Sequence, residues 1–187
     1  MRAIYILLFF TISIPLLLSC GTDANEDDPD GDLKEFELAS NGITIKCNDA
    51  NPGDRGTVDG EIYVAVDNDR LRRRADSGSD LTKVCVSLVT NMINLFEDTD
   101  FNQAIEHWDV SNVTTMSGMF ESSAFNQPID NWDVSSVTDM SWMFYNNREF
   151  NQPVGNWDVS NVTDMSGLFS YTRFNQPIEN WDVSSVM

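Results

Sequence analysis

Basic side chains and histidine are scarce in this sequence of 187 residues, which has 11 Lys+Arg against 30 Asp+Glu and a formal net charge of -19. So negative a surface repels a phosphate backbone, which excludes sequence-independent binding of DNA or RNA. One histidine and three cysteines supply too few ligands for a His/Cys zinc site. The 41% hydrophobic residues still suffice for a packed core. The composition therefore favours a secreted or surface-exposed binding protein.

A long apolar run occurs at the N-terminus alone, over residues 3–18. It is shorter than the ~20 residues of a bilayer span and suits a signal peptide. The run ends in Leu17-Leu18-Ser19-Cys20-Gly21, which resembles the box of bacterial lipoproteins, in which the cysteine is diacylated and becomes the mature N-terminus. We therefore expect a lipoprotein signal peptide over 1–19, fatty acylation (palmitate) at Cys20, and a bacterial envelope protein anchored in the outer membrane and exposed at the surface. An uncleaved anchor or a plain signal peptide is the alternative.

Residues 20–40 are interpreted as a flexible acidic tether. The stretch from Gly21 to Asp32 is acidic, rich in turn formers and almost free of apolar residues, so it cannot bury a core. It loosely resembles the acidic segment that follows the cysteine in surface-exported lipoproteins of the Bacteroidetes.

A repeat of 24–25 residues organises the second half of the chain. Each copy opens on Phe-Asn-Gln and continues to Trp-Asp-Val-Ser, a valine, a methionine and a second phenylalanine. The opening phenylalanines are Phe101, Phe125, Phe150 and Phe174, and the tryptophans are Trp108, Trp132, Trp157 and Trp181. A fainter copy lies upstream, between Val86 and Phe96.

Within one repeat the apolar spacing predicts two short elements. Thr138 can cap a helical turn that places Met140, Met143 and Phe144 on one face. Residues 129–134 alternate apolar and polar positions and predict a brief strand. We therefore expect an α/β repeat solenoid, leucine-rich-repeat-like, with one short strand and one short helical turn per coil. It occupies 81–187 as about four and a half coils, the last one truncated before its helical turn.

The units FNQAIEHWDVSNVTTMSGMF, FNQPIDNWDVSSVTDMSWMF and FNQPVGNWDVSNVTDMSGLF resemble the repeat of BspA-like leucine-rich-repeat surface lipoproteins and of a mycoplasma lipoprotein repeat family of unknown function. The resemblance implies an extracellular, non-enzymatic adhesion or binding module. Residues 41–80 resemble, more loosely, the segment that precedes such repeats in flavobacterial proteins.

Residues 41–80 are predicted to form a small α+β cap that covers the first coil. The residue types indicate a strand over 43–46, a hairpin turning at Asp59-Gly60 and a helix from Asp67 to Ala75. Once Cys20 is lipidated, the two thiols left outside the cytoplasm are Cys47 and Cys85, which predicts a disulfide between them. Two buried free thiols are the alternative.

Several residue sets are candidate sites. The aspartates Asp109, Asp133, Asp158 and Asp182 recur once per coil, which suggests hydrogen bonding within their Asp-Val-Ser turns or, less favoured, a calcium ladder. The asparagines after the opening phenylalanines are expected to hydrogen-bond successive coils. Arg70, Arg72, Arg73 and Arg74 predict a solvated helix face, with an anionic-ligand patch as the alternative.

The function expected from these features is binding or adhesion to an extracellular protein, matrix component or glycan, without catalysis and without a cofactor. The alternative is a carbohydrate-binding module that uses the repeated tryptophans, with Trp132 and Trp157 as ligand contacts if they face solvent, although their strict repetition among other apolar residues favours a core role. Non-repeated residues in the loops, Tyr145, Arg148 and Tyr171, are the other candidate contacts. His107 stands where other copies carry asparagine, and no nucleophile motif accompanies it.

Overall fold

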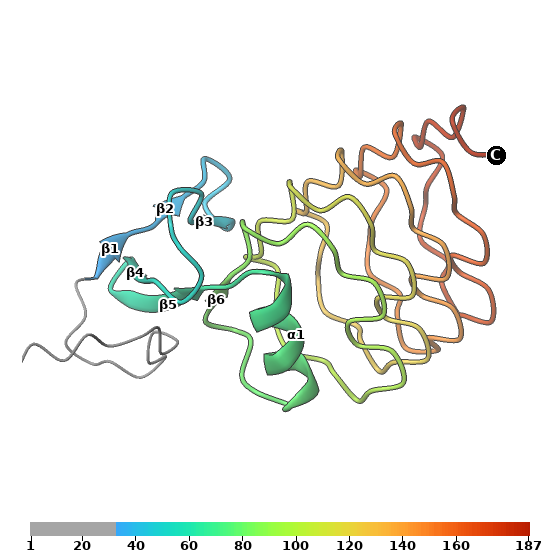
Figure 1. Cartoon of the computed structure of the whole chain (residues 1–187). Coiled ribbons are helices and arrows are strands. Elements are labelled where there is room, and N and C mark those ends of the chain that lie inside the picture. Colours follow the sequence, from blue (N-terminus) through green and yellow to red (C-terminus); the bar gives the residue numbers. More distant parts are fainter. Residues whose placement is uncertain (1–32) are drawn as a thin grey trace, which may run out of the picture.

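A computed structural model describes residues 33–187. The predicted signal peptide over 1–19 and the lipidation site at Cys20 lie outside the described residues. Figure 1 shows strands and one helix at the N-terminal end, followed by the repeats as successive turns of the chain that lie side by side up to the C-terminus. The order of elements is β1, β2, β3, β4, β5, α1 and β6.

The cap is built on a four-stranded sheet of order β1-β4-β5-β6. Its strands are β1 (Lys34–Glu35), β4 (Arg55–Val58), β5 (Glu61–Ala65) and β6 (Val84–Cys85). β4 and β5 form the predicted antiparallel hairpin, and β1 and β6 add to its two sides as parallel partners. Asp59 and Gly60 both have positive φ, 50° and 82°, as two-residue hairpin turns require.

The predicted helix is confirmed as α1 (Asn68–Asp76). Asp67 caps it, because its side chain accepts a hydrogen bond from the backbone N–H of Arg70 at 2.9 Å. Leu71 is the residue of the helix that is buried, and the side chain of Asn68 bonds to Thr90 at 3.1 Å. The helix is therefore held against the first repeat by its buried Leu71 and by the hydrogen bond from Asn68 to Thr90.

The expectation of a tether up to residue 40 is wrong for its last part. Residues from Lys34 onward are paired: β1 joins β4, and β2 (Glu37–Leu38) forms a second antiparallel sheet with β3 (Ile45–Lys46). Phe36, between the two strands, is buried over Gly56, where a Cβ atom would stand 2.3 Å from the phenylalanine ring. The acidic composition of this segment gave no sign that Phe36 would be buried, and its ring fits only because Gly56 has no side chain.

A disulfide joins Cys47 to Cys85, as predicted, with 6.3 Å between the two Cα atoms. Both cysteines are buried in a small cluster with Phe36, Ile45 and Val58. Cys85 belongs to β6, so the first residues assigned to the repeats complete the sheet of the cap. The bridge therefore covalently ties the cap to the start of the repeat array.

Adjacent repeats pair in parallel at one position per repeat. Single β-bridges link Asn91 to Thr115, Thr115 to Asp139, and Asp139 to Asp164. The backbone hydrogen bond from Met116 to Asp139 and the bond from Met140 to Asp164 are both 2.9 Å. The repeats thus lie one beside the next in a common register of 24 or 25 residues.

The two elements expected within each repeat do not form as regular structure. Residues 129–134 and 138–144 carry turns and isolated bridges, with neither a strand nor an α-helix. In the second segment alternate backbone N–H groups donate to the next repeat: Trp142 donates to Ser166 and Phe144 to Leu168, whereas Met143 donates back to Met140. Positive φ at Trp142 (61°) and Asn146 (53°) also interrupts any helix. The helical spacing of apolar residues reflects which side chains face the core. The backbone itself forms hydrogen bonds with the next repeat.

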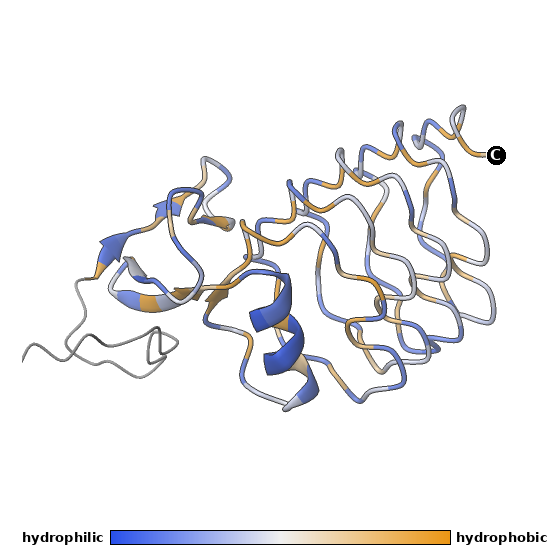
Figure 2. Ribbon diagram, viewed as in Figure 1, coloured by the Kyte–Doolittle hydropathy of each residue, from blue (hydrophilic) through white to orange (hydrophobic). Residues whose placement is uncertain are grey.

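The core consists of aromatic columns that run through the repeats. Phe96, Phe120, Phe144 and Phe169 follow one another at 5.6–5.7 Å between ring centroids. A second column, from Phe101 through Phe125 and Phe150 to Phe174, runs at 6.0–6.3 Å. Figure 2 shows the same apolar positions recurring from one turn of the chain to the next. The recurring apolar residues therefore pack against one another and form the core of the repeats.

Candidate functional site

The loops of the third and fourth repeats carry an exposed aromatic group. Tyr171 is 72% exposed and Trp142 is 45% exposed, whereas Tyr145 is half-buried. The rings of Trp142 and Tyr145 lie 4.7 Å apart with a tilt of 46°, and Tyr145 meets Tyr171 edge-on at 5.3 Å. We call these three side chains the aromatic platform. The structure thus brings together two of the predicted contacts, Tyr145 and Tyr171, and adds Trp142.

Two arginines lie on the loops of the platform. Arg148 follows Tyr145 by three residues, and Arg173 follows Tyr171 by two. Both are exposed, and within residues 33–187 neither guanidinium has a hydrogen bond or an ion pair. The predicted contact Arg148 is therefore available to a ligand, as is Arg173.

The prediction of Trp132 and Trp157 as ligand contacts is wrong. Each indole is 4% exposed and belongs to the core cluster. The indole N–H of Trp132 donates to the carbonyl of Ile105 at 3.2 Å, and that of Trp157 to Ile129 at 3.1 Å. Their polar atoms are satisfied by the preceding repeat, so no face is left for a sugar ring. The core role that their strict repetition favoured is confirmed.

The recurring aspartates act in local hydrogen bonds. The carboxylate of Asp133 accepts from the backbone N–H and the hydroxyl of Ser135 at 3.1 and 2.6 Å, and Asp158 does the same with Ser160. These bonds to serine lower the pKa of Asp158 and of Asp182. Asp109 is buried and also accepts from Ser87 at 2.7 Å. The predicted role in the Asp-Val-Ser turn is confirmed, and over residues 33–187 no group of three His, Cys, Asp or Glu side chains has metal-binding geometry.

The asparagines after the opening phenylalanines form the predicted ladder. The side-chain oxygen of Asn102 accepts the backbone N–H of Asn126 at 2.9 Å, Asn126 accepts that of Asn151, and Asn151 that of Asn175, both at 3.0 Å. Each rung links one repeat to the next. These residues therefore hold the stack and are not free to contact a ligand through that oxygen.

His107 is half-buried between the cap and the repeats. Its ring stands 5.7 Å from that of Tyr63, and its Nε2 lies 3.3 Å from the carbonyl oxygen of Val84. Burial lowers the pKa of His107, against the opposing effect of the Val84 carbonyl. The imidazole is therefore a neutral packing group at the junction.

The lowered pKa of His107 predicts that the stability of the fold depends on pH. Because its pKa is lower in the folded than in the unfolded chain, the unfolded state binds the extra proton first, and stability falls as the pH drops below the ordinary value of 6.5 toward the folded pKa. We expect urea midpoints to decrease as the pH is lowered from about 6.5 through the folded-state pKa of His107. The decrease should vanish in His107→Asn, which carries the residue of the other repeats. An equal slope in both proteins over that interval would refute the assignment.

The arginine-rich helix is partly engaged. Figure 2 shows α1 as the most hydrophilic element of the cap. The guanidinium of Arg72 donates to the carbonyl of Ile93 at 2.7 Å, and Arg73 is exposed. Arg70 and Arg74 also have partners within the fold. The cluster therefore helps to dock the helix on the first repeat, in line with a solvated helix face.

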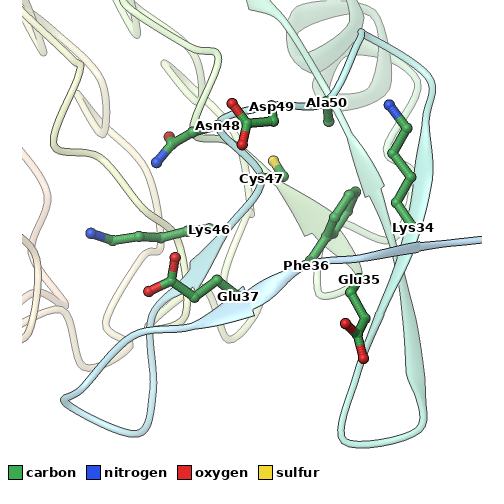
Figure 3. A pocket seen from close by; sticks show the side chains of 9 residues that line it. All are labelled: Lys34, Glu35, Phe36, Glu37, Lys46, Cys47, Asn48, Asp49 and Ala50. Carbon is green, nitrogen blue, oxygen red and sulfur yellow. The ribbon is translucent and has the colours of Figure 1, made fainter.

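One cavity of about 220 Å³ opens in the cap. Figure 3 shows Phe36 and Cys47 at its centre, Glu37 beside Lys46 at one end and Lys34 at the other. It is smaller than most ligand pockets. Lys34 is already paired with Asp54, and Cys47 is held in the disulfide, so neither side chain is free to act as a nucleophile in this cavity.

Three residues on the loops of the aromatic platform were not identified as functional candidates from the sequence. Trp142 occupies the position of Asn94, Gly118 and Gly167, and an aromatic residue in a glycine column was the available signal. Asn147 is fully buried and makes hydrogen bonds to Ser123, Phe125, Glu149 and Phe150, which stabilise a loop one residue longer than its equivalents. Arg173 stood out only as one of few basic residues.

The repeats define a family. The family described as "Mycoplasma protein of unknown function, DUF285" matches residues 69–172 and 121–187, and this chain belongs to it. Searches of the curated proteins and of the solved structures found no match. Over the part of the chain that the structure describes, no helix has the length and apolar character needed to cross a membrane.

Proposed function

We propose that the chain is a lipid-anchored bacterial surface protein of the BspA-like type, whose leucine-rich-repeat-like solenoid binds an extracellular protein, matrix component or glycan. The proposal assigns it no enzymatic activity and no cofactor. The Leu-Leu-Ser-Cys-Gly sequence before the acidic stretch supports lipidation at Cys20 and an outer-membrane, surface-exposed location.

One observation carries the binding role. The apolar residues that recur between repeats form the core, whereas the aromatic platform and Arg148 interrupt the repeat and are accessible on neighbouring loops. A scaffold of stacked units presents such residues at fixed spacing, which suits recognition of a large partner. Exposed aromatic residues in a group are unusual on a monomeric protein and mark interaction surfaces.

The anchor is tested by expressing the full chain in bacteria supplied with labelled palmitate. We expect label in the wild type and none in Cys20→Ala. The variant should also be lost from the membrane fraction, because the acyl chains on Cys20 supply the membrane affinity. Binding is measured with the same cells on immobilised collagen, fibronectin, laminin and mucin. Unlabelled wild type would refute the anchor, and cells that adhere no better than cells without the protein would refute the binding role.

A further inference from the structure

We infer that the aromatic platform with Arg148 and Arg173 is a binding site for a glycan that carries carboxylate groups, such as a uronic acid polymer. The inference rests on the proposed binding function and names its ligand class. Trp142, Tyr145 and Tyr171 would stack the apolar faces of pyranose rings, and the two guanidinium groups would pair with the sugar carboxylates.

The backbone of Trp142 has a conformation that is unfavourable for a bulky side chain. Its φ is 61°, in the left-handed region that disfavours bulky side chains, and the equivalent residues in adjacent repeats are Gly118 (62°) and Gly167 (68°). Asn94 has the same conformation at 51°. Glycine or asparagine suits this position, so a tryptophan there carries strain while its side chain remains 45% exposed. The indole is best explained by what it offers to a ligand.

The neighbouring repeat leaves room for this ring. A Cβ atom on Gly167 would lie 3.6 Å from the indole, so the ring rests over the glycine and Tyr145 flanks it at a tilt of 46°. The two rings are inclined to one another, and Tyr171 continues the surface into the next repeat. Such a surface spans two repeats and can follow successive sugar units of a chain.

Two arginines give the platform loops a local attraction for a ligand carboxylate, although the chain as a whole is strongly negative and Glu149 adjoins Arg148. After Lys83 the sequence contains two basic residues, Arg148 and Arg173, and both lie on the platform loops without a partner within residues 33–187. In the two preceding repeats the corresponding loops are acidic, with Glu97, Asp98 and Glu121. Burial, followed by repulsion from Glu97 and Asp98, raises the pKa of Glu121. We therefore expect the carboxylates of the ligand to pair with Arg148 and Arg173, on the side of the platform that faces the C-terminal repeats.

A glycan fits better than an acidic peptide because the exposed group is dominated by ring faces. A pyranose ring presents a flat C–H surface of similar size to an aromatic ring, and hydroxyls at its edge reach polar groups around it. The guanidinium fork matches a carboxylate with two parallel hydrogen bonds. The platform supplies both features on two adjacent loops.

The test uses the purified full-length chain in detergent and three oligouronates: oligogalacturonate, oligomannuronate and hyaluronan oligosaccharides. We expect at least one to bind and its methyl ester to bind at least about tenfold weaker, since esterification removes the carboxylates. A polyglutamate peptide should not bind. Failure of all three oligouronates, or equal binding of polyglutamate, would overturn the inference.

Variants locate the site. Trp142→Gly, which restores the residue of the adjacent repeats, should abolish binding while the circular dichroism spectrum and melting temperature are retained. Arg148→Gln combined with Arg173→Gln should remove the preference for the acid over its ester. Arg73→Gln, an exposed arginine on α1, is the control for a change of charge elsewhere and should bind as the wild type does. Binding that survives in Trp142→Gly would refute the site.

The cell adhesion assay separates this inference from the proposed function. If cells carrying Trp142→Gly or the double arginine variant adhere to matrix as the wild type does, the protein still binds its partner but not through the platform. If wild-type cells do not adhere at all while the purified chain binds an oligouronate, the ligand class stands and the role in matrix adhesion fails.

Discussion

Replacing Trp132 with alanine is expected to lower the free energy of unfolding by about 3–5 kcal/mol, the usual cost of removing a buried large aromatic side chain. The indole is buried to 4% exposure, lies parallel to Trp108 at 6.4 Å and contacts Phe120 at 6.5 Å. Its N–H also satisfies the carbonyl of Ile105, which the variant would leave buried without that donor. Urea unfolding followed by circular dichroism measures the change.

Trp142→Gly is the matched control, because it also removes an indole but from the surface. It loses the contact with Tyr145 and gains relief of the left-handed backbone, so we expect a change within about 1 kcal/mol. A mild loss in Trp132→Ala, equal to that of the control, would contradict the placement of the tryptophan column in the core. Such a result would also restore the tryptophans as candidate ligand contacts.

Removing the disulfide is expected to cost about 4 kcal/mol, the chain-entropy value for cross-linked residues at a separation of 38. The bridge stands between the cap and the first repeat, so its loss should release the end of the stack as well as destabilise the cap. Cys47→Ala combined with Cys85→Ala avoids free thiols. The comparison is made by urea unfolding of the variant and of the wild type, each with and without reductant.

Reductant should shift the midpoint of the wild type and leave the double variant unchanged. A wild-type midpoint insensitive to reductant under conditions where mass spectrometry shows both thiols free would contradict the stabilising role. The two core predictions are also separable in space. The tryptophan change acts within the repeats, whereas the disulfide change acts through the cap, where the backbone N–H of Cys47 donates a hydrogen bond to the hydroxyl of Ser87 at 3.1 Å.

Sequence periodicity identified the buried residues well because each copy contributes the same side chain to the same layer. The phenylalanine columns, the asparagine ladder and the Asp-Ser turns all follow from that rule, as the contacts of Phe120, Asn126 and Asp133 show. The hairpin and α1 were equally readable, since Asp59-Gly60 and Asp67 are local signals that need no partner. Disulfide pairing followed from the small number of thiols.

Periodicity was less informative about the backbone. Met140, Met143 and Phe144 have helical spacing, yet alternate N–H groups bond to the next repeat, as Met140 does to Asp164. Spacing reports which side chains face the core, and a helix and a hydrogen-bonded stack satisfy the same spacing. The acidic composition before residue 40 likewise concealed β1 and β2, because one buried ring, Phe36, is enough to fix a short segment on the sheet.

The sequence by itself determined the period, the layers of the core and the pairing of the cysteines, since each of these depends on residue identity repeated or limited along the chain. The tertiary structure decided which aromatic residues reach the surface. Trp132 and Trp142 are the same residue type ten positions apart, yet one is stacked between repeats and the other lies over a glycine at the edge. That difference arises from the direction in which each backbone position points its side chain, which is set by hydrogen bonds between repeats.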